Sequence, residues 1–171
     1  EEQLRRTPLF DALAASEPKV FRTIVDSFQH AFVEGVPEGR IMEELRTTKI
    51  APLILAHLPN ADDQLLADLA ALMADQYEAL GQRDPAACFS YAARGSTTNL
   101  DTLLPEALQQ RDLALSEAVL RATERRKSAA GPEVQGIYRK ISETLAAQFG
   151  AARVNILSDP SKVAPAQYAT Y

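Results

Sequence analysis

The sequence predicts an all-α protein, an irregular antiparallel bundle of about six to seven helices in a single domain. Apolar residues recur at intervals of three and four along most of the chain, which is the period of an amphipathic helix. Residues that favour strands are few and rarely alternate with polar ones. Proline, glycine and capping residues divide the chain into segments of helical length. The 171 residues are enough for one domain with its own hydrophobic core.

The first segments predict two helices. Thr7 and Pro8 form a helix start, so we expect residues 9–15 to form a short helix that lies across the bundle. Ser16 is expected to cap a second helix that runs to about Glu34. The apolar face of this second helix consists of Val20, Phe21, Ile24, Val25, Phe28, Ala31 and Phe32. Three phenylalanines on one face predict that this side is core.

A proline interrupts the next helical segment. Pro52 has no backbone N–H and disfavours helical geometry at Ala51, so a kink or break is predicted over residues 47–51. Residues 53–58 are almost wholly apolar, and we expect them to be buried on most sides.

The chain is organised around residues 60–95. Two acidic residues follow Asn60 and begin a long amphipathic helix, which we expect to end at Gly81. A shorter helix follows, capped by Asp84, ended by Gly95 and containing the only cysteine, Cys88.

The last third predicts two more long helices and a tail. One helix is expected from Pro105 to about Lys127, after a single turn that begins at Leu100, and the other from Pro132 to Phe149. The final helix carries one apolar stripe, formed by Val134, Ile137, Tyr138, Ile141, Leu145 and Phe149. We therefore expect one helical domain over residues 1–158 and a C-terminal tail over residues 159–171.

Charge and hydropathy narrow the classes of partner. The net charge of −5, with the acidic excess in the first half, argues against nucleic acid as a partner. No apolar run reaches the length of a transmembrane helix. The chain starts at Glu1 rather than at a methionine, so we expect it to be the soluble part of a longer, bacterial-type protein. A removed signal sequence or anchor is one candidate for the rest, which leaves a cytoplasmic and a periplasmic location both open.

The residues that most often carry chemistry form no recognisable motif. Cys88 has no histidine at motif spacing, and a free cysteine is usually a small buried hydrophobe. His30 and His57 lie on different predicted helices, and only Glu34, four residues after His30, is near either one in sequence. The adjacent carboxylates at 43–44 and 62–63 point about 100° apart on a helix. We therefore predict no catalytic residue, no metal site and no cofactor.

Two functions from different classes remain. The first is a non-catalytic helical interaction or scaffold module that binds a protein partner or a second copy of itself. The alternative is a helical regulatory domain that holds an apolar small molecule between helices. The residues expected to line such a site are Phe21, Phe28, Phe32, Met73 and Tyr77. We would look for it first between the helix at 60–80 and the helix at 18–34. An enzyme that uses Cys88 or the histidines is a third reading.

Overall fold

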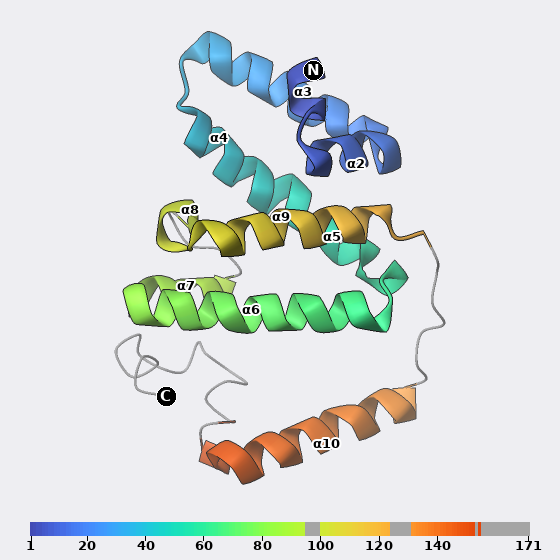
Figure 1. Ribbon diagram of the computed structural model, residues 1–171, viewed down its shortest axis with the longest axis vertical. Helices are drawn as coiled ribbons and strands as arrows, with labels where there is room; N and C mark the ends of the chain where they lie inside the picture. Colours follow the sequence, from blue (N-terminus) through green and yellow to red (C-terminus); the bar gives the residue numbers. More distant parts are fainter. Residues whose placement is uncertain (95–99, 124–130, 153, 155–171) are drawn as a thin grey trace. The chain divides into compact units, whose positions relative to one another are not determined.

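A computed structural model describes residues 1–94, 100–123, 131–152 and 154 (Figure 1). Within these ranges every regular element is a helix, which confirms the predicted all-α class. The α-helices are α1 (Glu2–Arg5), α2 (Pro8–Ser16), α3 (Pro18–Glu34), α4 (Glu38–Leu45), α5 (Ala51–His57), α6 (Asp63–Arg83), α7 (Pro85–Arg94), α8 (Leu100–Leu103), α9 (Glu106–Arg121) and α10 (Gly131–Phe149). A π-helical turn, η1 (Arg46–Ile50), joins α4 to α5, and a 3-10 turn, η2 (Leu58–Asn60), follows α5.

The helices group into two compact units. The first comprises residues 1–75 together with α9, and the second comprises the end of α6 from residue 76, α7, α8 and α10. The division therefore falls inside α6. The expected single domain over 1–158 stays a prediction, and the expected tail over 159–171 lies outside the described residues.

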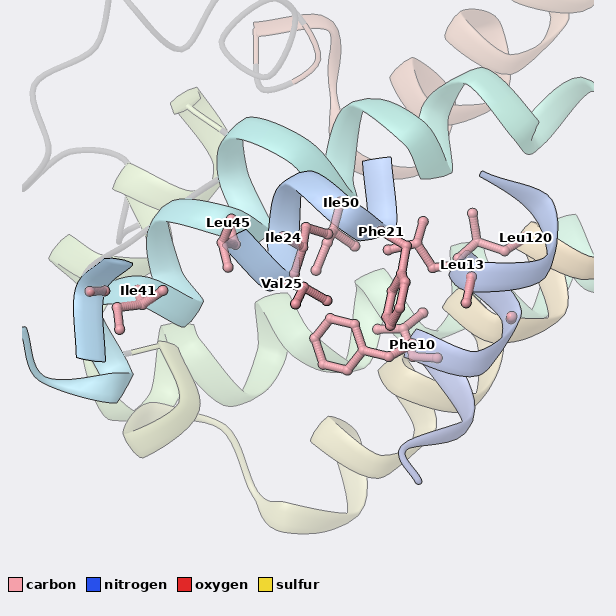
Figure 2. Close-up of a cluster of buried hydrophobic side chains, with 13 residues drawn as sticks. Phe10, Leu13, Phe21, Ile24, Val25, Ile41, Leu45, Ile50 and Leu120 are labelled. Atoms are coloured by element: carbon pink, nitrogen blue, oxygen red, sulfur yellow. The ribbon is translucent and has the colours of Figure 1, made fainter. Parts of the chain in front are cut away.

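The core of the first unit is built around the short helix α2. This helix packs against both α3 and α9, and it buries apolar residues on more than one side. Those residues are Leu9, Phe10, Ala12, Leu13 and Ala14. Figure 2 shows the rings of Phe10 and Phe21 turned toward each other, with Leu13 and Leu120 beside them. Helix α2 is thus at the packed centre of its unit, and its predicted position across a bundle stays a prediction.

The phenylalanine face of α3 is only partly core. Phe21 is 1% exposed and Phe28 is half-buried, but Phe32 is 85% exposed, so its predicted burial is wrong. The cause is a difference in length. Helix α3 has 17 residues and α2 only 9, so α2 covers the first turns of α3 and leaves the last ones to α4.

Acidic side chains cap the starts of α6 and α7, at Asp62 and Asp84. The predicted cap at Asp84 is confirmed, because its Oδ1 accepts hydrogen bonds from the backbone N–H groups of Ala86 and Ala87, both at 3.0 Å. The predicted cap at Ser16 is wrong: its hydroxyl donates to the Ala12 carbonyl oxygen at 2.9 Å, inside α2. Gly81 does not end α6, which continues to Arg83.

The expected interruption near Pro52 is a π turn. The hydroxyls of Thr47 and Thr48 donate back to carbonyl oxygens of α4, a bonding pattern that bends helices. Pro52 lacks the N–H that would bond one turn back, and the wider turn absorbs the loss. Ala51 keeps helical geometry at φ −59° and ψ −43°, contrary to the prediction. Burial of residues 53–58 on most sides is also wrong, since Leu55 is 66% exposed.

Helix α9 returns to the core over a long separation in sequence. It begins at Glu106 and ends at Arg121, earlier than the predicted end near Lys127, and residues 124–130 lie outside the described part. Its last turns bury Val119 and Leu120. The Arg121 guanidinium donates to a carboxylate oxygen of Asp11 in α2 at 3.2 Å, although this exposed pair contributes little to stability.

Two substitutions on α3 test this account of the core. Phe21→Ala removes a fully buried ring from the core to which α2, α3 and α9 contribute, so we expect the free energy of unfolding to fall by about 3–5 kcal/mol. Phe32→Ala, the matched control on the same helix, should cost less than about 0.5 kcal/mol because its ring lies in solvent. Urea unfolding followed by circular dichroism measures both. Equal losses would contradict the assignment of the core.

Candidate functional site

The first unit contains an open cleft of about 460 Å³, formed by α3 on one side and by α4 with η1 on the other. We call it the α3–α4 cleft. Its lining residues are Thr23, Asp26, Ser27, His30, Ala31, Glu34, Val36, Ile41, Glu44, Leu45, Thr48 and Lys49. Both walls follow helical spacing, so each helix presents one stripe of residues to the other.

A tight turn at the end of α3 brings the two walls together. Gly35 takes a left-handed conformation at φ 69°, which glycine adopts without strain. The backbone N–H of Val36 donates to the Ala31 carbonyl oxygen at 2.9 Å, and that of Gly35 donates to the Phe32 carbonyl oxygen at 3.3 Å. This is a Schellman motif, and Pro37 then opens the way into α4. The predicted end of α3 at about Glu34 is confirmed.

The floor of the α3–α4 cleft is apolar. Ala31, Ile41 and Leu45 are buried there, and they belong to the same cluster as Phe21 and Ile24 (Figure 2). The floor is therefore held by the core of the unit. Its position does not depend on the polar residues above it.

Acidic side chains dominate the walls. Asp26 and Glu34 stand on α3 and Glu44 stands on α4, against one cation, Lys49 of the π turn. The ring Nδ1 of His30 lies 3.3 Å from a carboxylate oxygen of Glu34. Within the part of the chain that the structure describes, Asp26, Glu44 and Lys49 form no ion pair. With His30 neutral, the cleft carries more negative than positive charge.

The hydroxyl groups of the walls already donate hydrogen bonds to backbone carbonyl oxygens of their own helical segments. Thr23 donates to the Lys19 carbonyl oxygen at 3.2 Å, Ser27 to that of Thr23 at 2.9 Å, and Thr48 to that of Glu44 at 2.8 Å. Each hydroxyl oxygen can still accept a hydrogen bond. The cleft therefore offers mostly acceptors.

The five residues proposed for an apolar ligand do not line this cleft. Phe21 belongs to the closed core, Phe28 packs against it, and Phe32 is 85% exposed and encloses nothing. On α6, Met73 is 48% exposed and Tyr77 is half-buried. The cleft lies between α3 and α4, and the expected apolar site between α3 and α6 stays a prediction. The acidic residues of the cleft stand at helical spacing on α3. This pattern can be seen in the sequence, but it is equally typical of an ordinary solvent-exposed helix face.

In the second unit, Cys88 lies in a small cluster with tyrosines and a buried amide. Its Sγ is 3.6 Å from the Tyr77 carbonyl oxygen, and burial raises the pKa of the thiol. The Tyr91 hydroxyl donates to Oε1 of Gln76, at 3.0 Å, and the rings of Tyr77 and Tyr91 are 5.5 Å apart. Gln76 is 2% exposed, and its Nε2 has no hydrogen-bond partner among the described residues.

The two histidines do not meet. Nε2 of His57 lies 3.4 Å from a carboxylate oxygen of Glu17, and its Nδ1 is buried without a partner among the described residues. His30 is exposed on α3. Within the described ranges, no three of His, Cys, Asp and Glu are grouped so that they could hold a metal ion.

Among the helices that the structure describes, α10 carries the largest number of exposed large apolar side chains. Its predicted stripe forms on one face of the helix, but the side chains are open: Ile137 is 53% exposed, Tyr138 67%, Ile141 49% and Phe149 46%. Val134 and Leu145, which share the face, are half-buried. We call these six residues the α10 stripe. Of the helices that the structure describes, none is both long and apolar enough to cross a bilayer.

Comparison of the chain with protein-family models, with curated proteins and with solved structures gives no match.

The burial of Cys88 predicts that its thiol reacts slowly in the folded chain. A raised pKa leaves less thiolate at a given pH, and the thiolate is the reactive form. At neutral pH we expect iodoacetamide to modify Cys88 more slowly in the folded chain than in the chain unfolded in urea. The rate in the folded chain should rise only above the usual pH range of a free cysteine. Modification of the native protein at the unfolded rate or faster would favour a nucleophilic role instead.

Proposed function

We propose that this protein is a non-catalytic helical interaction module, and that the α10 stripe is its contact surface. The observation that carries the proposal is the exposure of four large apolar side chains on one face of a single helix. Single exposed apolar residues are ordinary on protein surfaces, but a contiguous stripe of them is typical of an interaction site.

The stripe has the dimensions of a helix-binding surface. Helix α10 has 19 residues and is therefore about 28 Å long. The stripe runs from Val134 to Phe149, most of that length, and recurs every three or four residues. Its aromatic members, Tyr138 and Phe149, are of the types that contribute most to binding when a partner covers them. The other faces of α10 are polar and exposed to solvent, with the charged side chains of Arg139, Lys140 and Glu143.

The partner that fits such a stripe is another amphipathic helix or an apolar groove. In this mode of recognition, residues at i, i+3, i+4 and i+7 of one helix enter the partner surface. A second copy of this chain offers the same stripe, and a different protein could offer a groove. Both occupants bury the same six side chains, so one pair of variants tests both.

The test replaces Ile137 and Ile141 by glutamate and compares the result with Gln135→Glu plus Ala147→Glu. Both double variants add the same charge to exposed positions of α10, but Gln135 and Ala147 lie off the stripe. Analytical ultracentrifugation of the purified chain measures self-association. Affinity capture with quantitative mass spectrometry, repeated with each variant, measures binding to other proteins.

We expect the Ile137 and Ile141 variant to lose its partner or its second copy by more than about a hundredfold in affinity, because a buried contact then meets two charges. Its free energy of unfolding should change by less than about 1 kcal/mol, since both side chains are already about half-exposed. The control should bind as the native chain does. Unchanged association in the Ile137 and Ile141 variant, or its unfolding, would contradict the proposal.

A further inference from the structure

We propose that the α3–α4 cleft binds an aliphatic amine in its ammonium form. The site is distinct from the α10 stripe and does not depend on the interaction proposed for it. The claim is one of chemical class: an alkyl chain that lies on the apolar floor and a protonated amino group that meets the carboxylates above it.

The volume of the cleft sets the size of the ligand, and the apolar floor sets the chemistry of one part of it. A space of about 460 Å³ is in the range of small-molecule sites. Ala31, Ile41 and Leu45 form a floor that the core of the unit holds in place. Only a small part of these side chains is exposed, so the floor suits a short hydrocarbon chain of a few carbons.

The negative charge of the cleft walls favours a ligand whose polar group is positively charged. Asp26 and Glu34 face Glu44 from the opposite wall, and the only cation among the lining residues is Lys49. Asp26 and Glu44 form no ion pair with any described residue, so a cation entering the cleft displaces only water from them. An anion would meet three carboxylates and is disfavoured.

The hydrogen-bonding capacity of the walls points the same way. The hydroxyls of Thr23, Ser27 and Thr48 each donate within their own helix and can only accept from a ligand. Carboxylates also only accept. An alkylammonium group brings three donors and no acceptor, which matches this surplus of acceptors.

The π turn supplies the far end of the site. It carries Thr48 and Lys49 into the lining, and π turns in helices are often found at functional sites. Lys49 is itself an alkylammonium group and can occupy part of the cleft. Its removal should therefore strengthen binding of a free amine.

The ligand could be a free diamine or the lysine side chain of a partner peptide, and the experiment separates the two. The full chain, labelled with ¹⁵N, is titrated with 1,4-diaminobutane in one arm and with Nα-acetyl-lysine amide in the other. The Nε-acetylated form of the lysine amide serves as the uncharged control, and decanoate as the apolar anion. Amide chemical shifts in α3, α4 and η1 report the site and the dissociation constant.

We expect saturable shifts at the cleft with one or both amines and none with the acetylated form. Asp26→Asn with Glu44→Gln should weaken binding by at least about tenfold, equivalent to about 1.4 kcal/mol. The matched control, Glu78→Gln with Glu143→Gln, removes the same total charge from residues that do not line the cleft and should bind as the native chain does. Lys49→Gln should tighten binding by up to about fivefold, the range of an exposed charge.

Several outcomes would overturn the proposal. They are equal weakening in both double variants, equal binding of the acetylated form, tighter binding of decanoate, or no saturable shift at the cleft. Thermal melting of each variant confirms that it is folded, which is expected because Asp26 and Glu44 are both exposed. None of these results bears on the α10 stripe, so the two proposals fail separately.

Discussion

The burial of α2 is the interaction on which the first unit depends. A helix of 9 residues cannot hold its own shape in water, and α2 is stable because α3 and α9 cover its apolar residues from different sides. The contact with α9 joins residues about 110 positions apart, as the pairing of Asp11 with Arg121 illustrates. Fixing so distant a contact costs chain entropy, which the burial of Phe10, Leu13 and Leu120 must offset.

The same short helix explains why a cleft exists. Because α2 is shorter than α3, the last turns of α3 extend beyond α2 and pack against α4, and residues along this contact remain open to solvent. Polar residues are tolerated there, whereas the deeper Ala31, Ile41 and Leu45 must be apolar. The core thus fixes the floor of the α3–α4 cleft and leaves its walls free to carry charge.

The sequence was sufficient for the fold class and for most helix boundaries, because helical spacing and caps such as Asp84 and Gly35 act locally. The sequence did not predict burial correctly where burial depends on which other helix packs against a residue. Phe32 and Leu55 have the spacing of core residues, but nothing in their own segments says that the covering helix is too short or absent. The cleft was missed for the same reason, since Asp26 and Glu44 become neighbours of one space only after the turn at Gly35 has folded α4 back.

The first unit folds around α2, and the α10 stripe is left uncovered. Native-state hydrogen exchange of the full chain, at a dilution where it sediments as a monomer, tests this most directly. We expect the slowest amides in α2, the first turns of α3 and the end of α9, and exchange at least about a hundredfold faster along α10, as for a helix with few buried contacts. Protection of α10 equal to that of α2 would mean that its stripe is covered within the fold, and would contradict the account.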